Sequence, residues 1–281
     1  VINVGTRRPA DENQSSLSLE GGAYGYGRVL GTVSGRGVRA DLNLTRTDGW
    51  RGGTAYDRQS GTLRWDRIFG GDLYLKTVAT FSNIDQATAG TSALSRDDYE
   101  NDPTSNYTPI SFRKVRAVRV SSALEAQAGT GTLSLTPFFR FNSMDILPNW
   151  SLTFDPAIWE TQNMSYGLQA KYGLDVQSTG VRVVGGVDLD YSPGEHAERS
   201  ITPNRVAGIF ESYVDGAAIY DYDARFFQAS PYIQADYSTT RLSLSAGLRG
   251  DFMGYDYENR LSVEQTGQHR RPGNASPSFD D

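Results

Sequence analysis

Apolar and polar residues alternate with a period of two along most of the chain. In residues 164–175 the alternation runs through twelve positions without a break, with Met164, Tyr166 and Leu168 opposed by Ser165, Gly167 and Gln169. This period is typical of a β-strand, whose successive side chains point to opposite faces of a sheet. Similar runs predict eleven strands, near residues 15–24, 28–34, 38–45, 57–68, 73–82, 115–127, 133–142, 164–175, 181–191, 227–237 and 242–251. No segment shows the period of an amphipathic helix.

The length of these runs separates two kinds of all-β protein. Strands of soluble sandwiches are usually about 5–6 residues long, whereas the clearest runs here reach twelve residues. A tilted strand needs about 9–11 residues to cross a bilayer. The pattern therefore predicts an all-β fold, a transmembrane antiparallel β-barrel.

The predicted connections alternate between short and long. Short ones fall at 35–37, 69–72, 129–131, 177–180 and 238–240, and long ones at 48–56, 83–114, 143–163 and 192–224. Outer-membrane barrels have short periplasmic turns and longer extracellular loops. Loops of 20 to 30 residues would be uncommon in a compact soluble domain.

The two faces of the predicted strands differ in chemistry. The polar face carries both signs of charge, for example at Arg39, Asp41, Arg64 and Asp188, which suits a wide, wet lumen. The apolar face would meet lipid, and Trp65, Tyr172, Tyr191 and Tyr237 lie near strand ends as an interfacial girdle. The alternative interpretation of the polar face is that it is the hydrated outer face of a soluble sheet.

Composition excludes several classes of function. The 281 residues contain no cysteine and two histidines and carry a formal net charge of −6, so thiol chemistry and Cys-ligated metals are excluded. A pI near 5.1 argues against nucleic-acid binding. The sequence contains no run of 18 consecutive apolar residues, so it predicts no transmembrane helix. The chain begins at Val1, so we expect a processed N-terminus or a piece of a longer protein.

Two motifs have weak chemical interpretations. The spacing of Ser111 and Lys114 matches the S-x-x-K of serine acyl enzymes, but it falls outside any predicted helix and has no companion motif. The acidic residues Asp97, Asp98, Glu100 and Asp102 lack the spacing of a calcium loop, so a hydrated acidic loop is favoured. We therefore predict no catalytic residues, no metal site and no cofactor.

Several motifs resemble those of one membrane-protein family. The opening Val1-Ile2-Asn3-Val4-Gly5-Thr6-Arg7-Arg8-Pro9 is similar to the end of the plug domain of TonB-dependent outer-membrane receptors, where a V-I-N-[VI]-x-T-[KR] strand precedes the barrel. The segments 20–28, 48–57, 232–236 and 244–249 also resemble that family. The resemblance implies that residues 1–10 end a plug domain and lead into the barrel. Residues 11–281 would then form the N-terminal half of a 22-strand barrel, and we expect this piece not to function alone, because its edge strands would lack partners.

The resemblance also implies a function and partners. The whole protein would be an outer-membrane receptor that takes up a scarce, large solute, most often a ferric siderophore, with energy from TonB. Further partners would be its own plug domain, outer-membrane lipid and lipopolysaccharide, and no nucleic acid. Aromatic and basic residues of the long loops are the candidate ligand-binding residues. They are Trp50, Arg51, Tyr99, Tyr107, Arg113, Lys114, Trp150, Trp159, Tyr213, Tyr220 and Tyr222.

Two other functions remain open at this stage. An unplugged porin-like channel would have 16–18 strands and no need of a plug-like opening strand. An outer-membrane enzyme would need a catalytic group in the lumen or at the rim, which the scarcity of histidine disfavours.

Overall fold

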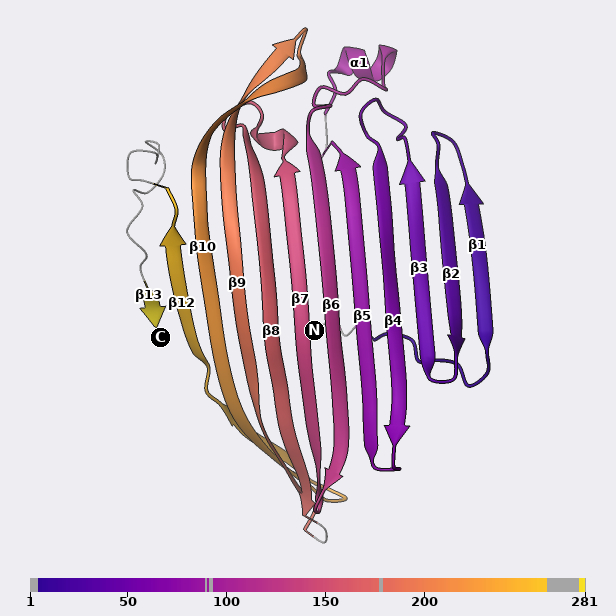
Figure 1. The fold of residues 1–281 in the computed structure, drawn as a ribbon, viewed down its shortest axis with the longest axis vertical. Coiled ribbons are helices and arrows are strands. Elements are labelled where there is room, and N and C mark those ends of the chain that lie inside the picture. The colour runs from indigo at the N-terminus through magenta and orange to yellow at the C-terminus, as the bar shows by residue number, and fades with distance from the viewer. Residues whose placement is uncertain (1–4, 89, 91–92, 177–178, 262–277, 281) are drawn as a thin grey trace.

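The computed structural model describes residues 5–88, 90, 93–176, 179–261 and 278–280, which form one open, curved antiparallel sheet (Figure 1). Ten strands follow one another in chain order, and each pairs with the next. They are β1 (Gln14–Gly21), β2 (Gly27–Gly35), β3 (Val38–Thr47), β4 (Tyr56–Phe69), β5 (Leu73–Ala87), β6 (Phe112–Ala128), β7 (Gly131–Leu147), β8 (Ala157–Val176), β9 (Val181–Val206) and β10 (Ile209–Ser238).

The next two strands act as one. Both β11 (Ser243–Arg249) and β12 (Phe252–Asn259) pair with β10, and the register is the same on both sides of the gap, from Tyr232 opposite Arg249 to Ala229 opposite Phe252. Counted as one interrupted strand, they complete the eleven strands predicted from the sequence. A short β13 (Ser278–Asp280) pairs with β12. The predicted all-β fold is confirmed.

The sheet has an apolar face and a polar face, and the apolar one is exposed. Leu63 and Ile233 on the apolar face are 46% and 53% exposed, whereas Arg64 on the polar face is 6% exposed. Outward apolar residues are typical of a barrel strand in lipid. The register aligns Tyr166, Tyr191 and Phe227 in one aromatic row across β8, β9 and β10. Tyr237 lies further along β10, near its C-terminal end.

The connections between strands lie at the two ends of the sheet, which we call the turn end and the loop end. At the turn end lie tight turns such as Arg36 and Gly37, both with positive φ. At the loop end lie the longer connections, one of which holds the helix α1 (Arg96–Asn101). No residue of α1 is buried, so it has no amphipathic pattern by which the sequence could predict it. No helix among the described residues is long and apolar enough to cross a membrane.

Two of the predicted long loops are wrong in extent. Residues 192–224 are a continuation of β9 and β10, which form a long hairpin closed by Ala207 and Gly208, both at positive φ as a type I′ turn requires. Likewise, β7 and β8 narrow the predicted loop 143–163 to residues 148–156, where η1 (Asn149–Ser151) lies. The register of the hairpin shifts three times between Phe210 and Tyr220. The row of Tyr166, Tyr191 and Phe227 ends the apolar band of the sheet. Beyond this row neither face of a strand needs to be apolar, so the period of two disappears although the backbone hydrogen bonds between the strands continue.

The buried apolar core lies at the loop end. Leu147, Leu152, Ile158, Ile201 and Phe210 pack together, with Ile110, Phe112 and Tyr213 against them. Backbone hydrogen bonds reinforce this contact, from the Phe210 N–H to the Tyr107 carbonyl (2.8 Å) and from the Ile201 N–H to the Pro156 carbonyl (3.0 Å). The tip of the β9–β10 hairpin is therefore docked onto the two neighbouring loops.

Candidate functional site

The polar face near the loop end carries a cluster of aromatic side chains around a histidine. The register places Thr161 of β8, His196 of β9 and Tyr222 of β10 side by side, with Trp159 and Glu198 one step closer to the loop end. We call Thr161, His196, Glu198, Tyr220, Tyr222 and Tyr257 the His196 cluster. It lies beyond the row of Tyr166, Tyr191 and Phe227, and therefore outside the apolar band.

Contacts within the His196 cluster are close. The ring centroids of His196 and Tyr222 are 5.2 Å apart, and those of Tyr222 and Tyr257 are 5.0 Å apart. His196 Nδ1 is 3.0 Å from Thr161 Oγ1, and His196 Nε2 is 2.9 Å from Glu198 Oε1. Both imidazole nitrogens are therefore engaged, which fixes the orientation of the ring.

Burial changes the acidity of the phenols. Desolvation raises the pKa of Tyr222, and the nearby Tyr257 and Glu198 add to this effect. Desolvation also raises the pKa of Tyr257. Both groups thus stay protonated at neutral pH and can donate hydrogen bonds to an acceptor, while their rings offer flat apolar surface.

A tryptophan pair extends the cluster towards the loops. Trp159 lies on β8 opposite Glu198, and its ring packs edge-to-face on Trp150 of η1, with centroids 6.5 Å apart. The structure thus brings four of the predicted residues, Trp150, Trp159, Tyr220 and Tyr222, to one end of the polar face.

The other predicted residues lie on different elements. The Arg51 guanidinium stacks over Trp50 at 4.9 Å, in the loop between β3 and β4. Tyr99 on α1 is 70% exposed. Arg113 donates to Gln86 Oε1 (2.7 Å). Tyr213 packs against the apolar core.

Tyr107 and the acidic residues near it hold α1 together. The Tyr107 hydroxyl donates to Asp98, and this bond, with that from Ser95, holds the pKa of the Asp98 carboxyl below its usual range. Glu100 pairs with Arg96 at 2.9 Å. Among the described residues, no group of three or more His, Cys, Asp or Glu side chains could hold a metal ion.

The serine motif does not form a catalytic pair. Ser111 is 1% exposed, whereas the Lys114 ammonium lies 5.7 Å above the Phe112 ring. Ser111 precedes β6 and Lys114 lies within it, so no helix brings the two side chains onto one face.

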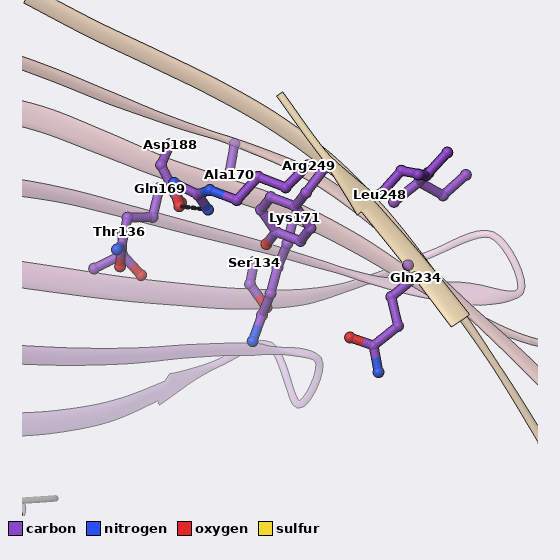
Figure 2. Close-up of a pocket in the computed structure, with 12 residues that line it drawn as sticks. Ser134, Thr136, Gln169, Ala170, Lys171, Asp188, Gln234, Leu248 and Arg249 are labelled. Atoms are coloured by element: carbon purple, nitrogen blue, oxygen red, sulfur yellow. Dashed lines mark hydrogen bonds and ion pairs between the residues drawn. The ribbon is translucent and has the colours of Figure 1, made fainter. Parts of the chain in front are cut away.

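Closer to the turn end the polar face forms an open cavity of about 530 Å³ between β7–β10 and β11. Figure 2 shows Arg249 reaching Asp188 from β11, with Leu248 on the other side of that strand. Arg249 donates to Asp188 Oδ2 and Asp251 Oδ1, both at 2.8 Å. Lys171 and other polar residues also line this cavity.

Solved structures with the same fold cover nearly the whole chain. The siderophore receptor PiuA from Acinetobacter baumannii matches 98% of the chain, with a TM-score of 0.69 at 12% identity. The open form of the ferric-catecholate import receptor Fiu from E. coli K12 also matches 98% with a TM-score of 0.69, at 12% identity. The outer-membrane ferripyoverdine receptor of Pseudomonas aeruginosa, bound to ferripyoverdine, matches 98% with a TM-score of 0.68 at 14% identity.

The fold is that of part of an outer-membrane receptor. The matches cover 47%, 50% and 39% of PiuA, Fiu and the ferripyoverdine receptor, so the chain spans between about 40% and 50% of such a receptor. The resemblance to TonB-dependent receptors that the sequence indicated is confirmed at the level of fold. No protein-family model matches the sequence, and no curated protein matches it either.

In this receptor fold the N-terminal segment, residues 6–10, lies on the polar face. Figure 1 shows it crossing the sheet towards β1. The Arg64 guanidinium donates to the Thr6 carbonyl (2.7 Å), while its other nitrogens bind both oxygens of Asp66 at 2.9 and 2.7 Å. The Ala10 N–H donates to Ser34 Oγ (2.8 Å). Residues 6–10 are thus fastened to β2 and β4.

Sequence reasoning missed His196, Glu198, Thr161 and Tyr257. His196 and Glu198 fall inside a segment that was predicted to be a loop. A signal was present in the spacing, since His196 and Glu198 are two residues apart, as are Tyr220 and Tyr222. Two strands with matching polar alternation would place these four side chains on one face.

Proposed function

We propose that this chain is part of a TonB-dependent outer-membrane receptor, in which residues 1–10 end the plug domain and residues 11–281 form the N-terminal half of the barrel. The observation that carries the proposal is the His196 cluster, an aromatic site on the polar face beyond the apolar band of a receptor fold. The polar face is then the lumen and the loop end faces the outside of the cell.

The proposed cargo is a ferric siderophore or a similar iron chelate. The cluster offers flat aromatic surface together with phenol groups that stay protonated, which suits a large ligand that carries both rings and anionic oxygens. The matched structures include receptors for ferric catecholates and ferripyoverdine, which supports this class of cargo. The porin-like channel is not favoured, because the matched structures are receptors. The same observation argues indirectly against an enzyme.

The proposed receptor has three kinds of partner: its own plug domain, TonB and the lipid of the outer membrane. A plug domain joined to residues 1–10 would fill the lumen, and TonB would act on that plug from the periplasmic side. Lipid would cover the apolar face, and lipopolysaccharide would lie around the loop end.

Binding to the complete gene product tests the proposal. The purified receptor is titrated with ferric citrate, a ferric catecholate and a ferric hydroxamate, and quenching of tryptophan fluorescence is followed. We expect one chelate class to bind, and Tyr222→Ala to weaken binding about tenfold, a loss of about 1.4 kcal/mol. Tyr191→Ala is the matched control, since Tyr191 lies on the apolar face of β9 and is 43% exposed, and it should bind like the unchanged protein.

Uptake of the radioactive iron chelate then tests the energy source. We expect uptake by cells to stop when tonB is deleted, with surface binding retained. Uptake that continues without TonB, or equal binding by the Tyr222→Ala and unchanged receptors, would contradict the proposal.

A further inference from the structure

The apolar face of the sheet is hollowed across β1 to β6. A groove of about 730 Å³ lies there, and apolar side chains such as Leu17, Leu63 and Phe81 form its sides. The face is not flat because large side chains alternate with glycines along one row of the register. From β1 to β6 this row consists of Leu17, Gly31, Leu42, Gly61, Phe81 and Val118.

The two glycines of the row differ in what covers them. A Cβ atom on Gly61 would lie 2.4 Å from the Phe81 ring, so this ring rests on Gly61. A Cβ atom on Gly31 would meet no atom within 4 Å, so the floor of the groove is open there. The charge of the lining residue Asp41 lies on the polar face, where its carboxylate accepts from Thr32 Oγ1 at 2.7 Å. We call this apolar hollow the Gly31 groove.

The Gly31 groove runs obliquely through the apolar band. On β6 the next residue of this face towards the loop end is Arg116, directly beyond Val118. On β1 and β3 the residues in the equivalent position are still apolar, Leu19 and Leu44. The groove therefore begins at the loop-side border of the apolar band on β6 and ends within the band at Gly31.

Arg116 places a positive charge at this border. Its side chain is exposed and makes no ion pair with any described residue, and its cross-strand neighbours Asn83 and Ser143 are uncharged. The acidic residues Asp85 and Asp145 lie one step farther towards the loop end, where water and salt screen their charge. The charged residue nearest to the groove is thus a cation.

An oblique apolar groove with a cation at its loop end matches the two parts of an anionic lipid. An acyl chain that lies in a groove contacts atoms on several sides, so it gains more dispersion attraction than on a flat wall. A guanidinium group binds phosphate oxygens through two parallel hydrogen bonds. Because the cation lies on the loop side, the lipid belongs to the leaflet that faces the outside of the cell.

We propose that the Gly31 groove and Arg116 form a binding site for one molecule of lipopolysaccharide. An acyl chain of its lipid A part occupies the groove, and a lipid A phosphate pairs with Arg116. This inference rests on the orientation given in the proposed function, and it adds a defined site to the general cover of lipid. The competing occupants are a phospholipid and a second copy of the chain.

Filling the groove tests the acyl-chain contact. Gly31→Leu adds a side chain where there is space, at a position without positive φ. The complete gene product in detergent is titrated with diphosphoryl lipid A and followed by native mass spectrometry. We expect the variant to bind about tenfold more weakly, which corresponds to the loss of about two buried methylene groups. Gly27→Leu is the matched control, since Gly27 lies on the same face of β2, is equally open and lies outside the groove.

Removing the cation tests the phosphate contact. Arg116→Gln should weaken binding of diphosphoryl lipid A about fivefold, the effect of one basic residue near an anionic membrane surface. It should leave binding of dephosphorylated lipid A unchanged, and Arg116→Lys should restore most of the affinity. Arg67→Gln is the control, because Arg67 is an exposed arginine on the same face at the turn end of β4, and it should bind like the unchanged protein.

Three results would overturn the inference: equal binding by Gly31→Leu and Gly27→Leu, an affinity for lipid A no higher than that for phosphatidylglycerol, or a dimer that Gly31→Leu abolishes. The second result would assign the groove to a phospholipid and the third to a second copy of the chain. Chelate uptake is measured in parallel. Retained uptake without lipid A binding refutes the lipid site alone, whereas no uptake by the unchanged protein refutes the proposed function.

Discussion

Single polar residues determine how the long loops are held, and Asn106 is the clearest case. It is 7% exposed, and its amide donates to the Gly52 carbonyl (2.8 Å) and to Thr88 Oγ1 (2.9 Å) while its carbonyl accepts from the Thr108 N–H (3.0 Å). One side chain thus connects the β3–β4 loop with both ends of the β5–β6 loop.

Replacing Asn106 by alanine should release both loops. The change leaves buried polar groups without partners, at a cost of about 1–3 kcal/mol. We expect backbone amides at 52–54 and 104–108 to exchange hydrogen at least tenfold faster, measured by mass spectrometry. Asn101→Ala removes an exposed amide bonded to Asp97 and should leave those segments unchanged. Equal exchange in the two variants would show that Asn106 does not hold the loops.

The Tyr107 hydrogen bond makes Asp98 respond to pH. Because this bond lowers the pKa of Asp98 in the folded loop, its stabilising effect is complete above the ordinary value of 3.8 and is lost as pH falls through the lowered pKa. Carboxyl NMR titration should therefore place Asp98 below 3.8, and Tyr107→Phe should raise its pKa. Tyr99→Phe, which changes an exposed hydroxyl, should not. An Asp98 titration unaffected by Tyr107→Phe would contradict this assignment.

At the scale of elements, the β9–β10 hairpin is the part of the fold that sequence reasoning did not predict. Up to Tyr191 one face must be apolar to meet lipid, so the period of two is visible and the strands were predicted. Beyond it, polar residues such as Glu195 and Glu198 occupy both faces, and the bulges near Ala218 shift the register. The ladder there depends on the partner strand, a long-range contact that no local pattern encodes.

The same limit applies to the candidate site. Tyr220, Tyr222 and Trp159 could be chosen from the sequence as aromatic residues outside the apolar runs. Their gathering around His196 follows from the register between β8, β9 and β10, which is set by three strands at once. Residue type was therefore predictable, and proximity was not.

Phe210 should anchor the tip of this hairpin. It is 6% exposed within the apolar core, and burying a phenylalanine contributes about 3–5 kcal/mol relative to alanine. Phe210→Ala should undock the tip and increase hydrogen exchange of residues 201–213, with the membrane strands unaffected. Val214→Ala, at a position that is 70% exposed, serves as the control. Unchanged exchange at the tip would mean that the backbone bond to Tyr107 suffices.

At the scale of the whole molecule, the sheet is organised inside out. Exposed apolar side chains such as Leu63 and Ile233 point away from the curved polar face, and ion pairs such as Arg140 with Asp190 lie within that face. An open sheet of this kind leaves β1 paired with β2 alone among the described strands. Lipid cannot satisfy such an edge, so we still predict that these residues do not function alone.

The inside-out arrangement predicts opposite responses to a charge at neighbouring positions of one strand. Ile233 lies on the apolar face of β10 between the aromatic rows of Phe227 and Tyr237, and it is 53% exposed. An arginine near the middle of the bilayer costs about 2–4 kcal/mol, so Ile233→Arg should lower the free energy of unfolding in lipid vesicles by that amount. Gln234 faces the polar cavity and already donates to Asp236 (2.9 Å), so Gln234→Arg gains an ion-pair partner and should cost less than 1 kcal/mol. Denaturant titration of the complete gene product in vesicles measures both. Similar losses for the two variants would mean that the apolar face does not meet lipid, because only the bilayer distinguishes these adjacent positions.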